Sequence, residues 1–271
     1  MTTARDDGDH LLLTGRWGSL AATPLGGTVT SWRPRGVPRL FTSRAARPAL
    51  GEMWHGGVPL CTPWFGQAAG AGWRVPWSHG LASRVRWDVT GAEGDDEGAR
   101  LTMTTTGAAT AGLPGADRYP ADLTYLLDVR ADARRLELRL TIGSPTEDTA
   151  VDAVFHPYFS ADATAEEVHG LDGVAFHDYA DDSDGVQAGP VRAAGPINRV
   201  YVGAPPVRLA RSGLRLDGDG CDTVVVWNPG PSSGQVPGDE WGSFACVEYG
   251  ALGVAIPAGG THEVTLRVTA S

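Results

Sequence analysis

Apolar and polar residues alternate with a period of two wherever a pattern can be read, and this feature limits the possible folds most strongly. The apolar members of three such segments are Val85, Trp87 and Val89; Leu136, Leu138, Leu140 and Ile142; and Val264, Leu266 and Val268. Successive side chains of a strand point to opposite faces of its sheet, so each segment predicts a half-buried strand of an antiparallel sheet.

Long helices are disfavoured, because 37 glycines and 19 prolines are spread through the 271 residues. Glycine-rich and acidic segments, such as residues 91–98, separate the strand patterns in the way that hairpin loops do. We therefore predict an all-β fold, either a large sandwich or a barrel. No linker or shift in composition divides the chain, so we expect one domain over residues 1–271.

The charges exclude several classes of function. All 22 basic residues are arginine, which excludes Schiff-base and pyridoxal chemistry and any phosphate loop that needs a lysine. The formal net charge is −10 and no basic stripe is visible, so a nucleic acid is not expected as a partner.

Cys61, Cys221 and Cys246 are too few and too irregularly spaced for a disulfide framework or a zinc site. The seven histidines form no HExxH motif and no i, i+4 pair, so no metal site is predicted. The N-terminal region is acidic and its longest apolar run is Leu11–Leu13, which predicts neither a signal peptide nor a membrane span. We expect a cytoplasmic protein with reduced thiols and no membrane partner.

Five of the nine tryptophans gather between positions 54 and 87, in a segment rich in glycine and proline. Their broad apolar rings with one polar edge suit a pocket for an amphipathic ligand such as a sugar. Filling the core of a large β-domain explains them equally well. The five residues are Trp54, Trp64, Trp73, Trp77 and Trp87.

Two acid-base candidates lie within strand-like sequence. His156 stands among aromatic residues in segment 154–159, and Glu248 follows an apolar run in segment 244–249. Alone, each is more often a core histidine with satisfied hydrogen bonds or a solvated carboxylate; together they form a possible acid-base pair.

Six segments in a fixed order resemble the D-hexose-6-phosphate mutarotases, relatives of aldose 1-epimerase in the galactose mutarotase-like superfamily. The resemblance spans about residues 27–250. The six segments are 27–32 (GTVTSW), 56–66 (GGVPLCTPWFG), 79–82 (HGLA), 156–159 (HPYF), 222–229 (DTVVVWNP) and 246–248 (CVE).

The resemblance implies a β-supersandwich of large antiparallel sheets with an open sugar pocket on a concave face. It also implies interconversion of the α and β anomers of an aldose without a cofactor. Glu248 would be the general base at the anomeric hydroxyl and His156 the general acid at the ring oxygen, on opposite sides of the sugar. His79 and Asp222 match positions that bind sugar hydroxyls. The expected partner is a small sugar or sugar phosphate, and the expected state is a monomer or weak dimer.

This chemistry needs one proton taken and one given at neighbouring oxygens, which a carboxylate and an imidazolium can supply. At a separation of about 7 Å and an effective dielectric of about 20, their attraction is about 2.4 kcal/mol. That attraction predicts a charged His156 beside an ionised Glu248 near neutral pH.

The resemblance weakens where a phosphate would bind. Two positions that carry arginine in members acting on hexose 6-phosphates are His55 and Ser83 here. Arg84 follows directly, but one residue further along a strand it would point to the other face; Arg74 is a second candidate. Either the arginines are relocated, with Arg84 and His55 serving the substrate, or the sugar carries no phosphate.

Three functions therefore stay open. The first is a mutarotase of an aldohexose or hexose 6-phosphate. The second is a non-catalytic carbohydrate-binding or regulatory protein on the same fold. The third is a lyase or glycosidase that uses Glu248 with a second acid such as Asp222, which requires the two carboxyl groups to lie about 5 to 10 Å apart.

Overall fold

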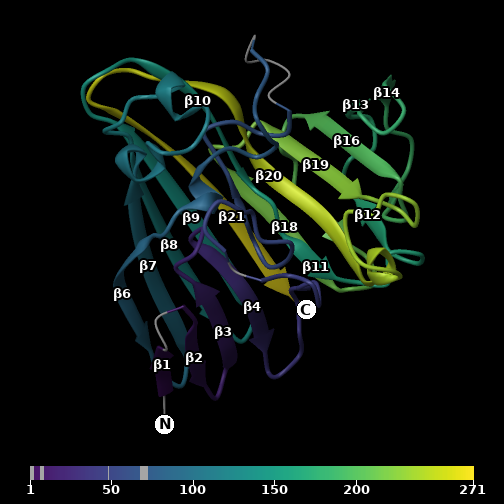
Figure 1. Ribbon diagram of the computed structural model, residues 1–271. Helices are drawn as coiled ribbons and strands as arrows, with labels where there is room; N and C mark the ends of the chain where they lie inside the picture. Colours follow the sequence, from purple (N-terminus) through teal and green to yellow (C-terminus); the bar gives the residue numbers. More distant parts are fainter. Residues whose placement is uncertain (1–2, 7–8, 48, 68–72) are drawn as a thin grey trace.

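A computed structural model describes residues 3–6, 9–47, 49–67 and 73–271 (Figure 1). Its described residues form three antiparallel sheets, and their only helices are four short 3₁₀ turns. The turns are η1 (Ala82–Arg84), η2 (Gly107–Thr110), η3 (Ala116–Arg118) and η4 (Glu240–Ser243). None of these helices is long or apolar enough to cross a bilayer.

The smallest sheet has the order β1-β2-β3-β4, with β1 at Thr3–Asp6, β2 at Leu11–Gly15, β3 at Gly18–Thr23 and β4 at Thr28–Pro34. A second sheet has the order β14-β13-β16-β19-β20-β10-β5, and β11 also pairs with β20. Its bounds are β5 Leu60–Cys61, β10 Thr149–Phe155, β11 Tyr158–Ser160, β13 Ala175–Asp178, β14 Ser183–Val186, β16 Ile197–Val202, β19 Thr223–Asn228 and β20 Phe244–Ile256.

The largest sheet has the order β15-β12-β17-β18-β21-β9-β8-β7-β6. Its bounds are β6 Asp88–Gly94, β7 Gly98–Thr106, β8 Thr124–Asp132, β9 Arg135–Ser144, β12 Glu167–His169, β15 Val191–Arg192, β17 Val207–Leu209, β18 Leu214–Asp219 and β21 Gly260–Ala270.

The predicted all-β sandwich is confirmed, and two of the three alternating segments form strands as expected. The apolar residues of β9 and β21 that alternate in the sequence are all buried. The strand predicted for the third segment is wrong in part, because residues 82–84 form η1 and β6 begins only at Asp88. Val85 and Trp87 are still buried, but Val89 is exposed. The first two residues therefore pack beside the turn η1 and not within the predicted strand.

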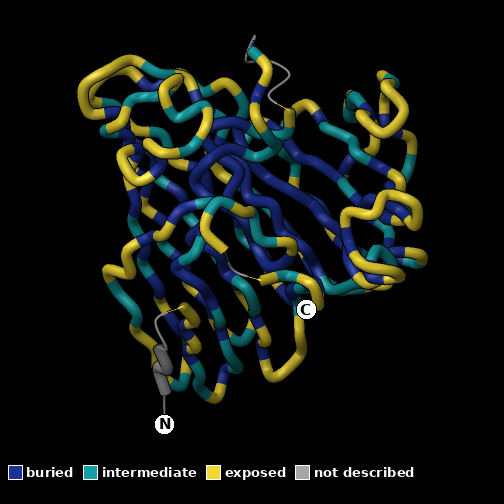
Figure 2. Tube along the Cα trace, in the orientation of Figure 1, coloured by how far each residue is buried: buried dark blue, intermediate teal, exposed yellow. Residues whose placement is uncertain are grey.

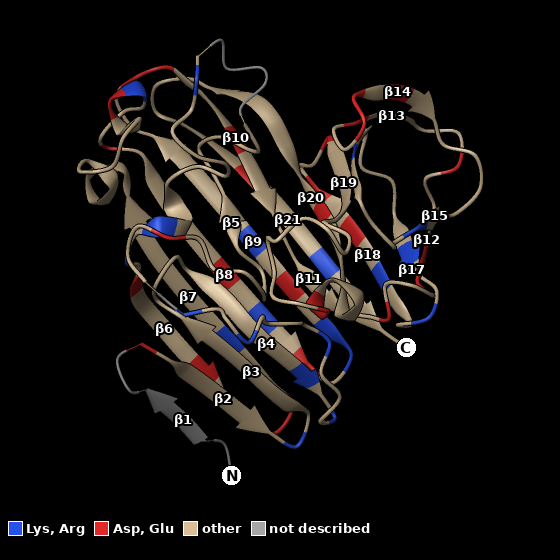
Figure 3. Ribbon diagram, turned by 45° about the vertical axis from the view of Figure 1, so that its right-hand side comes forward, with Lys and Arg blue, Asp and Glu red and all other residues tan. Residues whose placement is uncertain are grey.

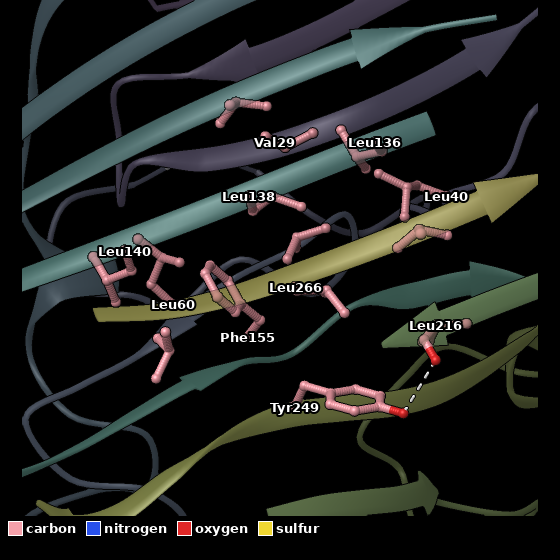
Figure 4. Close-up of a cluster of buried hydrophobic side chains, with 14 of the residues drawn as sticks. Val29, Leu40, Leu60, Leu136, Leu138, Leu140, Phe155, Leu216, Tyr249 and Leu266 are labelled. Atoms are coloured by element: carbon pink, nitrogen blue, oxygen red, sulfur yellow. Dashed lines mark hydrogen bonds between the residues drawn. The ribbon is translucent and has the colours of Figure 1, made fainter. Parts of the chain in front are cut away.

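The core lies between the two larger sheets. Figure 4 shows side chains of β9 and β21 meeting Phe155 of β10 and Tyr249 of β20. The Tyr249 hydroxyl donates to the Pro205 carbonyl oxygen at 2.7 Å and also lies 3.4 Å from the Leu216 carbonyl oxygen of β18. Figure 2 shows the resulting pattern, with buried strands at the centre and exposed loops around them. One cluster of buried apolar residues runs from Leu11 to Ala270.

The other face of the second sheet carries a different set of side chains. Along β20, Val247 and Tyr249 belong to the core between the sheets. Cys246 belongs to a separate cluster with Tyr158 and Phe244 on the opposite face. Since side chains alternate, Glu248 lies on that opposite face as well. The face away from the core is therefore where the sheet presents its acid-base residues.

Candidate active site

Strand register places His156 opposite Glu248. β10 ends with Phe155 paired to Tyr249, and β11 begins with Tyr158 paired to Cys246. These two pairs share one offset, so the intervening residue His156 stands across from Glu248. Directly opposed residues point to the same face of a sheet. Two segments that are far apart in the chain thus meet at one point.

His156 and Glu248 are in contact. The His156 Nε2 atom lies 3.4 Å from the Glu248 Oε1 atom. Both side chains are nearly buried, at 3% and 1% exposure, yet both line a cavity of about 1080 Å³ that opens on this face. The expectation that they flank the sugar from opposite sides, about 7 Å apart, is therefore wrong: they lie side by side, as cross-strand neighbours must.

Burial opposes the charged forms of both groups. Burial, with a smaller contribution from His79, holds the pKa of His156 well below its usual value, and burial raises the pKa of Glu248 well above its own. Burial therefore favours neutral imidazole beside a protonated carboxyl, whereas the attraction expected at a separation of about 7 Å predicted the ion pair. Both forms hold one proton between the two residues, and they differ only in its position.

His79 reaches the same cavity from a loop. Its backbone has a φ of 69°, and Gly80 follows with a φ of 70°. A side chain at residue 80 would lie 2.1 Å from the Thr62 carbonyl oxygen, so this close approach requires glycine. The Gly66 N–H donates to His79 Nδ1 at 3.3 Å, which leaves the Nε2–H as a donor. The rings of His79 and His156 meet edge to face, with centroids 5.2 Å apart.

His55 lies at the edge of the same site. Its Nδ1 atom is 3.5 Å from the hydroxyl of Tyr158, whose ring stacks on His156 at 4.9 Å. Desolvation lowers the pKa of His55, and the charge of Arg84 lowers it further. His55 lines the cavity as predicted.

Arg84 also lines the cavity, although it was expected to point away from Ser83 on a strand. It ends the 3₁₀ turn η1, so the strand argument does not apply. Ser83 is buried and outside the cavity lining, and Arg74 is exposed and outside it as well. Of the two arginine candidates, only Arg84 is near the site.

Asp222 does not line the cavity. It is exposed, and its Oδ1 atom accepts the Leu252 N–H at 3.2 Å and the Thr223 hydroxyl at 2.8 Å. The predicted contact of Asp222 with sugar hydroxyls, and its pairing with Glu248 in a hydrolase, gain no support from this position. Asp222 instead holds the bulge of β20 whose residues Leu252 and Gly253 line the cavity.

Asp152, which the sequence did not single out, lines the cavity. Val151, Ala153 and Phe155 of β10 pack in the core, so alternation places the side chain of Asp152 on the opposite face of the sheet, the same face as His156. The two carboxylate oxygens of Asp152 accept the N–H groups of Phe65 and Gly253, each at 2.7 Å. The sequence signal that could have indicated Asp152 is a carboxylate in the middle of an otherwise apolar strand.

The tryptophan cluster divides between the two explanations that were left open. Trp87 is buried in the main core. Trp64 is buried among the loops and also lines the cavity, with Trp73 and Trp77 packed against its cluster. Trp227 of β19 and Phe65 supply further aromatic surface in the cavity. Aromatic rings beside hydrogen-bonding groups suit a sugar, which has an apolar C–H face and a rim of hydroxyl groups.

The fold and this site define a galactose mutarotase-like β-sandwich protein. The model of the aldose 1-epimerase family matches residues 10–269, and the chain belongs to that family. A curated relative from Salmonella typhimurium, named "Putative glucose-6-phosphate 1-epimerase", is 31% identical over 240 residues, covering 82% of this chain and 76% of the relative.

Solved structures agree on the fold. A crystal structure titled as a "putative mutarotase" from Salmonella typhimurium has a TM-score of 0.83 and 26% identity, covering 98% of this chain and 92% of that one. A galactose mutarotase-like protein from Clostridium acetobutylicum has a TM-score of 0.71 over 99% and 97% of the chains. At 12% identity, the second likeness shows the fold alone.

Proposed function

We propose that this protein is a mutarotase that interconverts the α and β anomers of an aldohexose or a hexose 6-phosphate by acid-base ring opening. The observation that carries the proposal is the contact between His156 and Glu248 at the floor of the cavity. The anomeric hydroxyl oxygen O1 and the ring oxygen O5 are bonded to the same carbon. Two proton-transfer groups that lie side by side suit two such oxygens.

In the proposed ring-opening step, the Glu248 carboxylate takes the proton of O1, the C1–O1 bond becomes a double bond, and the C1–O5 bond breaks. His156 gives its proton to O5. The C1–C2 bond then rotates, and ring closure reverses both transfers. The ion pair and the neutral pair are therefore the protonation states at the two ends of this step. Burial disfavours the ion pair, so it makes His156 a stronger acid and Glu248 a stronger base.

The other cavity residues take supporting roles in this proposal. The Nε2–H of His79 donates to a sugar hydroxyl beside His156. Asp152 joins the loop at Phe65 to the bulge of β20 at Gly253, and so fixes two walls of the cavity. Phe65 and Trp227 stack on the apolar face of the ring.

The test is the exchange between anomers, followed by NMR magnetisation transfer on glucose, galactose, mannose and glucose 6-phosphate with and without protein. Exchange faster than the uncatalysed rate for at least one sugar is expected. Sugar binding with no acceleration for any of them would favour the non-catalytic carbohydrate-binding protein instead.

A further inference from the structure

The charges of the cavity wall bear on which sugar it takes. Among the described residues that line the cavity, three carry carboxyl groups and one is an arginine. The carboxyl groups are those of Glu52, Asp152 and Glu248. Burial raises the pKa of Glu248 well above its usual value and raises that of Asp152 as well, so the exposed Glu52 is the carboxyl group of this wall whose negative charge burial does not oppose. β10 and β20 each carry one acidic residue, in the middle of the sheet (Figure 3). Residues 68–72, outside the described part, are alanine and glycine and add no charge.

The three histidines of the cavity add little positive charge. Burial lowers the pKa of His79 to about 4, and the pKa values of His55 and His156 are also below their usual range. A neutral imidazole offers one N–H donor and carries no charge that could neutralise an anion. Arg84 is therefore the one lining residue of the described chain that carries a full positive charge at neutral pH.

The Arg84 guanidinium is already engaged by the protein. Three of its five N–H groups donate to backbone carbonyl oxygens, those of Gly80 at 3.2 Å, Gly51 at 2.7 Å and Ser78 at 3.2 Å. Its planar face lies 4.5 Å from the centre of the Trp77 ring. These contacts tie loop 78–80 to loop 49–51, so the position of Arg84 is explained by holding two loops together.

A phosphate group would meet this wall at a disadvantage. A phosphate carries nearly two negative charges, and it would have to exchange water for an arginine with only two N–H groups left to donate. The nearby Glu52 carboxylate, whose negative charge raises the pKa of Arg84, would repel it. A hydroxyl group at the sixth carbon needs only hydrogen-bond partners. A protein can reject an anionic ligand by placing a negative charge beside it that no cation neutralises.

We infer, building on the proposed mutarotase function, that the substrate of this cavity is an uncharged aldohexose and that hexose 6-phosphates are discriminated against. The cavity wall selects by charge at the end of the sugar away from the anomeric carbon. The curated relative named for glucose 6-phosphate would then differ from this protein in its substrate.

The decisive experiment compares kcat/KM for anomer exchange of glucose, galactose and mannose with that of glucose 6-phosphate. It uses a phosphate-free buffer of low ionic strength, and each uncatalysed rate is subtracted. The best neutral sugar should exceed glucose 6-phosphate by tenfold or more. A smaller ratio or a preference for the phosphate overturns the inference and leaves the mutarotase function standing. Acceleration of none of the sugars instead contradicts the proposed function itself.

Charge variants test the cause. Glu52→Gln and Glu52→Lys should raise the activity ratio of glucose 6-phosphate to neutral sugar by about three- to tenfold per unit of charge at low salt. The same changes at Glu97, in the turn between β6 and β7, serve as the matched control. An unchanged ratio in both Glu52 variants contradicts exclusion by charge.

Arg84→Gln gives an independent readout. If Arg84 holds loops, the variant loses activity on both kinds of sugar by the same factor. A loss confined to glucose 6-phosphate overturns the inference. Should this variant fail to fold, the wild-type ratio and the Glu52 variants still decide the matter.

Discussion

His156 and Glu248 face one another across neighbouring strands, with His156 Nε2 3.4 Å from Glu248 Oε1. The pair rests on rigid sheet structure, since β10 and β11 both pair with β20 on either side of it. Its geometry is therefore set by backbone hydrogen bonds and not by a mobile loop. Groups held in this way lose little entropy when a sugar arrives, which is how positioning contributes to rate.

The pH dependence of stability should report on His79. Its pKa falls from 6.5 to about 4 in the folded protein. Between pH 6.5 and about 4, His79 binds a proton in the unfolded chain but not in the folded protein. The free energy of unfolding is therefore highest above pH 6.5 and decreases as the pH falls toward 4. The decrease in unfolding free energy is at most about 3 kcal/mol. Solvent screening makes it smaller, because the His79 side chain is only partly buried.

Urea unfolding at pH 7.5 and pH 5 measures this effect. His79→Asn should show a smaller drop between the two pH values than the wild type, and asparagine tolerates the left-handed backbone at this position. His169→Asn, in an exposed part of β12, is the control and should keep the wild-type drop. An unchanged drop in His79→Asn would show that His79 is not the group responsible.

Asp152→Asn should destabilise the protein and weaken catalysis without abolishing it. An amide has one oxygen where the carboxylate has two, so one of the N–H groups of Phe65 and Gly253 loses its acceptor. The expected cost is about 1 to 3 kcal/mol of unfolding free energy. Asp148→Asn, where one exposed oxygen accepts the Ala258 N–H, should cost clearly less. Equal effects of the two substitutions on stability and activity would refute the role given to Asp152.

Asp222→Asn separates the proposed mutarotase from a hydrolase that pairs two carboxyl groups. Asp222 lies outside the cavity lining, so kcat/KM for anomer exchange should change by less than about threefold. A loss as large as that of Glu248→Gln would place Asp222 in the chemistry. Assaying the same proteins for release of an aryl leaving group from aryl glycosides checks the hydrolase directly.

The sequence predicted the fold well because alternation is a local signal. Leu136 to Ile142 reads as a half-buried strand from its own residues, and β9 has that structure. It predicted less of the site. That His156 and Glu248 are adjacent depends on the register of β10 and β11 against β20, which no local pattern encodes.

The positions of Arg84 and Asp152 escaped prediction for related reasons. Arg84 was read on a strand, but residues 82–84 form the turn η1, whose Ala82 carbonyl oxygen accepts the Trp87 Nε1–H at 2.8 Å. Asp152 shares a face of β10 with His156 by alternation, but the N–H groups of Phe65 and Gly253 that hold its carboxylate come from distant segments. Asp222 matched a motif, yet its carboxylate accepts the Leu252 N–H and so holds the bulge of β20. Each depends on contacts between distant segments.

We propose that His156 and Glu248 transfer the two protons of ring opening. The most direct measurement is anomer exchange by NMR in Glu248→Gln and His156→Asn, with sugar affinity measured by calorimetry on the same samples. Exchange should fall by about 100-fold or more in each variant, while the Kd for sugar changes by less than about threefold. Exchange at the wild-type rate in either variant would show that the substituted residue does not transfer a proton.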